Sequence, residues 1–336
     1  MTTIHAYAAT SAGGALEPFE FDAGPLGGGE VEIEVEHCGV CHSDLSMLDN
    51  EWRFTPYPLV PGHEVIGRIA ALGEQVDQLK VGQRVGLGWI SHSCLQCRDC
   101  LGGDQNHCAT KTQTIIGRHG GFADRARCQA TWAIPLPEKL PAQVAGPLFC
   151  GGVTVFNAIT ESDIRPTHRV GVVGIGGLGH LALQFLNKWG CEVTAFTSSE
   201  SKADEARALG AHHVVNSRSS DELHKIGNTL DFILSTVNVE LDWGAYLNTL
   251  RPRGRLQTVG IIGAPLSLVS FQLVSAQRSI GGNPVGSPAT TADMLDFCTR
   301  HKIVPTTEHF PMSQANDAMQ HLRSGKARYR VVLDRT

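Results

Sequence analysis

The chain has 336 residues, 42% of them hydrophobic and 18% charged, which is typical of a globular protein with room for two domains. A formal net charge of -5 provides no basic field, so we expect neither duplex nucleic acid nor a membrane surface as a partner. The chain has no signal-like start and no run of about 20 apolar residues, so we expect a cytoplasmic protein. In that compartment thiols stay reduced, so the ten cysteines indicate metal ligands and buried core residues.

The pattern of apolar and polar residues changes near residue 150. Residues 31–36 alternate apolar and acidic side chains, as in a strand half exposed to water. From about residue 150, apolar strands (169–174, 191–196, 214–215 and 231–234) alternate with helical patterns (178–189 and 201–209), which predicts a parallel sheet wound on both faces. Gly190 lies at a helix stop. A helix over 290–301 and a strand over 329–333 follow. We therefore expect a two-domain α/β protein with a β-rich domain (1–147 and 288–336) and a doubly wound parallel-sheet domain (148–287).

Four cysteines share one short stretch with the pattern C-x2-C-x2-C-x7-C. Four thiolates at this spacing suit a closed tetrahedral zinc site that stabilises the fold without taking part in chemistry. A disulfide pair and an iron–sulfur cluster are the alternatives. The residues are Cys94, Cys97, Cys100 and Cys108.

A glycine-rich segment follows the strand 169–174 and opens the helix 178–189. The pattern G-x-G-x-x-G at a strand-to-helix turn lets the backbone approach a pyrophosphate at the helix N-terminus. Alone it is more often an ordinary tight turn, but the strand, helix and alternating continuation favour a dinucleotide site. Its residues are Gly174, Gly176, Gly177, Leu178 and Gly179.

About 20 residues further on, a carboxylate normally selects NAD by accepting from the ribose 2′-hydroxyl. Here the chain offers hydroxyls and an ammonium group instead, which favours NADP(H), although Glu200 lies among them. The serines could equally cap the next helix. The residues concerned are Thr197, Ser198, Ser199 and Lys202.

A second metal site is suggested by Cys41, His63 and Cys150, because two thiolates and an imidazole suit a zinc ion with a fourth position open. From spacing alone, each is more often a packed core residue. Cys38 and Cys41 also form a C-x-x-C pair that a redox protein could use, but Cys38 ends an alternating strand and is assigned to packing. Three further cysteines are assigned to the core: Cys128, Cys191 and Cys298.

At these motifs the whole chain resembles the zinc-dependent medium-chain alcohol dehydrogenases, especially the cinnamyl-alcohol-dehydrogenase-like branch and its bacterial NADPH-dependent aldehyde reductases. The resemblance implies a GroES-like catalytic domain, a Rossmann domain, two zinc ions per chain and NADPH-dependent reduction of aldehydes to primary alcohols. It also implies a homodimer or homotetramer. The segments that carry it are CGVCHSDLSM, GHEVIG, CGGVTVF, GIGGLGH, NPVGSPAT and GKARYRVVL.

The resemblance also implies roles for single residues around the metal. Cys41, His63 and Cys150 would hold the catalytic zinc, and the four-cysteine cluster would hold the structural one. Glu64 would lie behind the catalytic metal and ligate it transiently. Asp44 would orient the imidazole of His63, and His42 would lie near the metal and the cofactor phosphates.

By the same resemblance, Ser43 would exchange a proton with the substrate oxygen and Thr154 would contact the nicotinamide. Trp52 and Trp89 would line an apolar substrate channel, although a large aromatic side chain is more often core. The chain departs from many relatives at Ser46, where they have a histidine that completes a proton relay.

Three other functions are alternatives to this interpretation. A zinc-free quinone reductase of the same fold would lack Cys41, His63 and Cys150, so the presence of all three counts against this alternative. A structural or redox-sensing protein would bind NADPH without turnover, and a thiol-based sensor would use Cys38 and Cys41.

Overall fold

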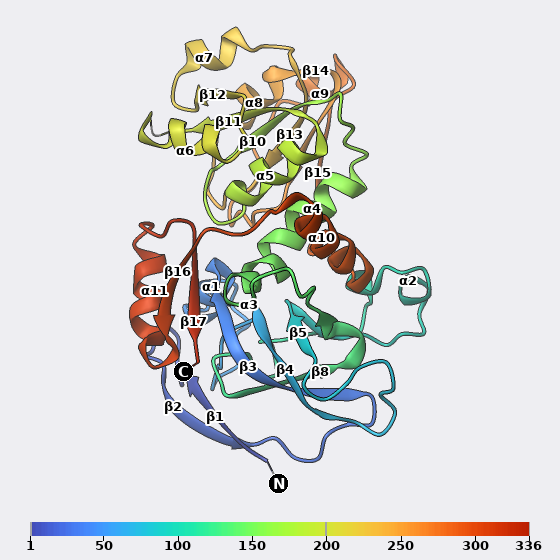
Figure 1. Cartoon of the computed structure of the whole chain (residues 1–336). Coiled ribbons are helices and arrows are strands. Elements are labelled where there is room, and N and C mark those ends of the chain that lie inside the picture. Colours follow the sequence, from blue (N-terminus) through green and yellow to red (C-terminus); the bar gives the residue numbers. More distant parts are fainter. Residues whose placement is uncertain (1, 199, 336) are drawn as a thin grey trace. The chain divides into compact units, whose positions relative to one another are not determined.

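The computed structural model describes residues 2–198 and 200–335, which form two compact units (Figure 1). The first unit comprises Met1–Val153 and Val285–Thr336, and the second comprises Thr154–Pro284. The domain limits expected from the sequence stay a prediction.

The second unit contains a six-stranded sheet in which all neighbouring strands run parallel. Its order is β12-β11-β10-β13-β14-β15, the 3-2-1-4-5-6 order of a doubly wound dinucleotide fold. The order reverses between β10 and β13, and ligands bind such sheets at the carboxyl ends of the strands. The strands are β10 (Arg169–Val173), β11 (Glu192–Thr197), β12 (His213–Asn216), β13 (Leu230–Ser235), β14 (Leu250–Thr258) and β15 (Ser279–Gly282).

The helices of this unit confirm most of the expected periodicity. α5 ends at Gly190, whose φ of 103° is the left-handed conformation that favours glycine. The helix expected over 201–209 is shorter, because a 3-10 turn, Glu200–Lys202, precedes α6. The helices are α5 (Gly179–Trp189), α6 (Ala203–Ala208), α7 (Ser220–Lys225), α8 (Trp243–Thr249) and α9 (Phe271–Val274), and α4 (Gly151–Glu161) crosses the division between the units.

The first unit is built on a seven-stranded mixed sheet of order β16-β17-β3-β4-β5-β9, with β8 also paired to β3. Two separate two-stranded antiparallel sheets, β1–β2 and β6–β7, accompany it. The strands are β1 (Thr3–Ala8), β2 (Glu17–Asp22), β3 (Glu30–Val40), β4 (Val65–Leu72), β5 (Arg84–Leu87), β6 (Ile90–His92), β7 (Thr112–Gln113), β8 (Arg125–Gln129), β9 (Ile134–Pro135), β16 (Thr307–Pro311) and β17 (Arg330–Asp334).

Helices of this unit are mostly short, and two of them belong to the C-terminal segment. They are α1 (His42–Leu48), α2 (Arg98–Leu101), α3 (Ala142–Ala145), α10 (Pro288–His301) and α11 (Ala315–Arg323). The 3-10 turns are Gln105–His107, Ala130–Trp132, Gly146–Phe149 and Met312–Gln314. The expected C-terminal helix and strand are α10 and β17.

The expected exposure of β3 is wrong at Glu32. Val31, Ile33 and Val35 are buried as the alternation predicts, but Glu32 is buried too. The reason is β8, which pairs with β3 and brings Arg127 to 2.7 Å from the Glu32 carboxylate. A buried charge needs such a partner, and the local pattern does not reveal it.

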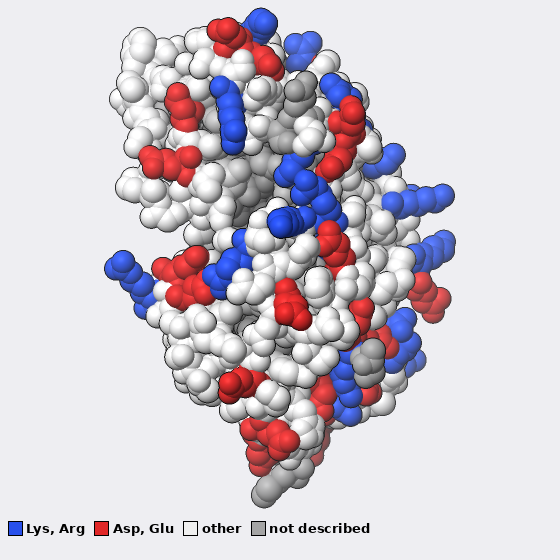
Figure 2. All heavy atoms as spheres, turned by 90° about the vertical axis from the view of Figure 1, so that its left-hand side faces the viewer, with Lys and Arg blue, Asp and Glu red and all other residues white. Residues whose placement is uncertain are grey.

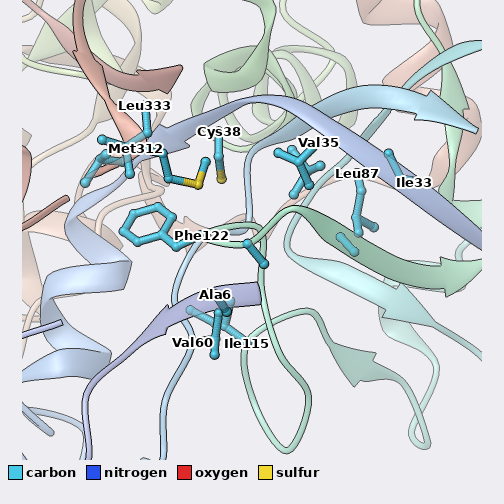
Figure 3. Packing of buried hydrophobic residues seen from close by; sticks show 14 of the residues in the cluster. Ala6, Ile33, Val35, Cys38, Val60, Leu87, Ile115, Phe122, Met312 and Leu333 are labelled. Carbon is cyan, nitrogen blue, oxygen red and sulfur yellow. The ribbon is translucent and has the colours of Figure 1, made fainter. Parts of the chain in front are cut away.

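Cys38 lies in the hydrophobic core of the first unit, among Phe122, Met312 and Leu333 (Figure 3). Its thiol is fully buried, and burial raises the pKa of Cys38 well above its usual value. A thiol with so little thiolate character is a poor redox nucleophile. The structure therefore favours the packing assignment over a Cys38–Cys41 redox pair.

No single described helix is long and apolar enough to cross a membrane, although one bent pair, Ala142–Phe149 with Gly151–Glu161, passes the same criteria jointly. Both segments contribute buried core residues, including Leu148 and Val155. Acidic and basic side chains are interspersed over the face shown in Figure 2.

Candidate active site

Three segments far apart in the sequence bring Cys41, His63 and Cys150 together in the first unit. Cys41 follows β3, His63 precedes β4, and Cys150 lies at the start of α4. The two sulfurs are 3.8 Å apart, and His63 Nε2 is 3.3 Å from the Cys150 sulfur. Tetrahedral zinc with Zn–S bonds near 2.3 Å places its sulfur ligands about 3.8 Å apart. The donor set and its spacing therefore fit zinc.

Asp44 positions two of these candidate metal ligands, Cys41 and His63. Its buried carboxylate accepts the backbone N–H groups of Cys41 and Gly62, each at 2.9 Å, and lies 3.0 Å from His63 Nδ1. Because Nδ1 is engaged with a carboxylate, Nε2 is the nitrogen that faces Cys150. Burial lowers the pKa of His63, but the charge and hydrogen bond of Asp44 outweigh burial and raise it well above normal.

The Glu64 carboxylate is also fully buried, and one of its oxygens lies within 4.8 Å of the donor atoms of Cys41, His63 and Cys150. Oε1 accepts a hydrogen bond from the Arg330 guanidinium, whereas Oε2 has no partner among the described residues. Burial raises the pKa of Glu64 to about 6 despite the opposing charge of Arg330. A Cβ atom at position 39 would lie 1.9 Å from Oε2, so glycine is required there.

The two thiols of the site titrate as a pair. The hydrogen bond with Cys150 holds the pKa of Cys41 well below its usual value, although burial opposes this. The same hydrogen bond, together with burial, raises the pKa of Cys150. The pair thus gives up its first proton readily at Cys41, and a bound cation would displace the second.

The four-cysteine cluster forms a separate site around α2. Its four sulfurs lie within 4.8 Å of one another, and those of Cys94 and Cys100 are 3.9 Å apart. Backbone N–H groups point at three of them: Cys94 N at Cys108 Sγ, Cys97 N at Cys94 Sγ and Cys100 N at Cys97 Sγ, at 3.3 to 3.5 Å. The spacing exceeds an S–S bond of about 2.0 Å and fits four ligands of one ion.

Other residues expected near the Cys41, His63 and Cys150 site have the following surroundings. Trp89 packs edge to face on the His63 ring, with centroids 4.9 Å apart, and Trp52 packs on Trp89 at 6.1 Å. Ser43 is half-buried and His42 exposed on α1. Ser46 is buried and donates to the exposed Glu51 carboxylate at 2.6 Å.

In the second unit, three glycines of the turn after β10 have different surroundings. Gly174 has a φ of +86°, and a Cβ on Gly179 would lie 1.9 Å from the Gly174 carbonyl oxygen. A Cβ on Gly176 would meet nothing within 4 Å, so open space lies beside this backbone. A tight turn, a close helix–strand contact and an open approach are the features that a pyrophosphate site requires.

The residues expected near the ribose follow β11. Thr197 is buried, Ser198 is exposed and Lys202 is half-buried, while Ser199 lies outside the described residues. Thr154 is buried in α4. The positions of these residues do not test their expected roles. Those roles, and the roles expected of Ser43, His42, Trp52 and Trp89, stay predictions.

Sequence reasoning missed three residues that the structure places at the sites. Arg330 opens the apolar strand β17, and a lone arginine in such a run is a signal for a buried partner. Thr236 follows β13 and donates to the Gly174 carbonyl oxygen at 2.8 Å, which fixes the glycine turn. Glu51, the partner of Ser46, has no local signal.

Comparison with known proteins agrees with both units. Residues 27–138 match the family "Alcohol dehydrogenase GroES-like domain" and residues 177–300 match "Zinc-binding dehydrogenase". An aldehyde reductase, AdhA, from Synechocystis sp. is 54% identical, with 98% of each chain covered.

Solved structures include a cinnamyl alcohol dehydrogenase from Sorghum bicolor, with a TM-score of 0.95, 36% identity and coverage of 99% of this chain and 98% of that one. Another, from Helicobacter pylori in complex with NADP(H), has a TM-score of 0.92, 28% identity and the same coverage. The chain therefore belongs to the zinc-dependent medium-chain alcohol dehydrogenase family, in its cinnamyl-alcohol-dehydrogenase-like branch.

Proposed function

We propose that this protein uses NADPH and zinc to reduce aldehydes to primary alcohols, reversibly. The observation that carries the proposal is the convergence of Cys41, His63 and Cys150, with zinc-like spacing and no fourth cysteine among the residues that the structure describes. Membership of a family that contains aldehyde reductases and cinnamyl alcohol dehydrogenases supports the substrate class. No observation favours a sensing or structural protein without turnover.

In this proposal the two cysteines and His63 hold a catalytic zinc, and the four-cysteine cluster holds a structural zinc. When bound, zinc supplies Lewis-acid polarisation of the aldehyde oxygen, and NADPH supplies the hydride. Asp44 keeps the imidazole oriented through Nδ1. The hydroxyl of Ser43, two residues after Cys41, donates the proton that the reduced oxygen needs. Trp52 and Trp89 border the substrate.

NADP(H) is proposed over NAD(H) because Ser198 follows β11 where an NAD-selective protein places a carboxylate. The Helicobacter pylori relative, solved with NADP(H), supports this assignment. We also propose a homodimer or homotetramer, as the family resemblance implies, and a cytoplasmic location, as expected from the sequence.

A panel of aliphatic and aromatic aldehydes tests the activity, with NADPH and NADH oxidation followed side by side at 340 nm. We expect aldehyde-dependent oxidation that is faster with NADPH at subsaturating cofactor. Zinc content is measured on the same preparation. If no aldehyde accelerates cofactor oxidation in a protein that contains zinc, the enzyme proposal is wrong.

The variant Ser198→Asp tests the ribose-reading position. A carboxylate there would face the 2′-phosphate, and like charges in contact cost enough to raise the KM for NADPH by at least about tenfold. The KM for NADH should stay the same or fall. Ser198→Ala is the control for loss of the hydroxyl alone. An unchanged KM for NADPH in Ser198→Asp would show that another residue reads the ribose.

A further inference from the structure

The loop after β12 lies directly beside the end of β11, where Ser198 is found. β11 and β12 are parallel neighbours, with Thr197 opposite Asn216, and the Ser217 N–H donates to the Thr197 carbonyl oxygen at 3.0 Å. Neighbouring strands are about 4.8 Å apart, and β11 and β12 are neighbours in Figure 1. Residues 217 and 218 therefore lie at the carboxyl end of the sheet, as Ser198 does. Residues 217 and 218 belong neither to the glycine-rich turn (174–179) nor to the hydroxyl-rich segment (197–202).

This loop is fixed by hydrogen bonds at both ends. The Asn216 N–H donates to Glu222 at 2.7 Å, and the Asn216 side chain accepts the Arg218 N–H at 3.0 Å. Ser219 caps α7 by accepting the Glu222 N–H at 3.3 Å. The backbone of Arg218 is therefore held in one place at the sheet edge, while its side chain is exposed.

The charge of Arg218 is not neutralised within the described part of the chain. Arg169, Arg207 and Arg251 each form an ion pair with a carboxylate, but Arg218 forms none and makes no side-chain hydrogen bond to a described residue. Oε2 of the nearby Glu222 carboxylate accepts the Asn216 N–H, and no ion pair joins Glu222 to Arg218 among the described residues. A cation without a partner, at the edge where the cofactor ribose is proposed to lie, is available to an anion.

We propose that Arg218 binds the adenosine 2′-phosphate of NADP(H), together with Ser198 and Lys202, and is a main determinant of the preference for NADP(H) over NAD(H). The inference rests on the proposed function and extends it by one residue from a different strand. A guanidinium matches a phosphate with two parallel N–H donors, and charge-assisted hydrogen bonds of this kind are among the strong ones. A free ribose 2′-hydroxyl offers no such charge, so the contact discriminates between the two cofactors.

The test measures binding of cofactor fragments to purified protein by calorimetry, independently of turnover. 2′,5′-ADP carries the 2′-phosphate and 5′-AMP lacks it. We expect Arg218→Gln to weaken 2′,5′-ADP and NADP⁺ by about 10- to 100-fold, the range for one hydrogen-bonded charged contact. Binding of 5′-AMP and NAD⁺ should stay within about twofold, because the variant leaves the rest of the site intact. Arg218→Lys should retain part of the affinity.

The matched control is Arg255→Gln. Arg255 is also exposed and without an ion pair among the described residues of this unit, but it pairs with Ser279 at the start of β15, toward the amino ends of the strands. This control should bind 2′,5′-ADP like the wild type, which separates a local contact from a loss of net charge. Melting curves verify that all variants are folded.

Two results would overturn the assignment alone: wild-type affinity of Arg218→Gln for 2′,5′-ADP, or an equal loss for 2′,5′-ADP and 5′-AMP. A wild type that binds both fragments equally would overturn the NADP(H) preference itself, and this assignment with it.

Discussion

Cys150→Ser is expected to lower kcat/KM for aldehyde reduction by more than about 100-fold while leaving the fold largely intact. Loss of a partner behind a metal ligand already costs about 10- to 100-fold, and Cys150 is proposed as a ligand itself. The zinc proposed here is catalytic, with one position left open, and does not close a structural cluster, so loss of Cys150 should change the melting temperature little. Cys97→Ser should lower the melting temperature and leave turnover largely intact. Its cluster is proposed to hold a closed structural zinc that supports the loop around α2.

The measurements are steady-state kinetics, zinc content by atomic emission and thermal melting of both variants. If Cys97→Ser loses even about 2 kcal/mol, its melting temperature should fall by about 4–8 °C. Cys128→Ser is the control for removing a buried thiol that belongs to neither cluster. A fully active wild type with one zinc per chain would contradict the two-site proposal, as would a Cys150→Ser variant with normal turnover.

Features set by neighbouring residues could be predicted from the sequence. The helix stop at Gly190 depends on one glycine in the left-handed region, and the turn from Gly174 to Gly179 depends on three missing side chains. The four-cysteine cluster is local too, because all its ligands lie within one loop. In each case the physical requirement and the residues that meet it share a few positions.

Features that join distant segments could not be predicted in this way. Glu32 alternates as if exposed, yet β8 buries it. The contact between Glu64 and Arg330 spans 266 residues, and an arginine in an apolar strand signals a buried partner without showing which residue that partner is. The donor types of Cys41, His63 and Cys150 suggest a zinc site, but their wide spacing carries little signal, so their role as ligands depends on the family resemblance. The position of Arg218 could not be predicted for the same reason, because only the pairing of β11 with β12 places it beside Ser198.

The buried pair of Glu64 and Arg330 leads to a large expected effect on stability. Arg330→Met removes the positive charge and leaves the Glu64 carboxylate buried and uncompensated, which should lower the free energy of unfolding by about 3–5 kcal/mol. Glu64→Gln alone should also destabilise, because it leaves a buried guanidinium. The double variant should recover part of the loss, since it leaves no buried charge of this pair.

The loss in Arg330→Met should depend on pH in a defined direction. The pKa of Glu64 is raised to about 6, mainly by burial, while the charge of Arg330 opposes the rise. Without Arg330 the pKa should rise further, so the folded variant binds a proton that the unfolded chain releases near its ordinary value. Stability of the variant then falls as pH rises through this window, and the gap from wild type should be smaller at about pH 5 than at about pH 8.

Urea unfolding of the four proteins at both pH values measures this cycle. Arg300→Met is the surface control, because Arg300 pairs with Asp296 on α10 with both side chains more than 60% exposed. Removing such a pair should cost about 0.5 kcal/mol or less. If Arg330→Met is no less stable than this control, the Glu64 carboxylate must become neutral or reach solvent without cost. It would then be a mobile group of the metal site and not a charge fixed by Arg330.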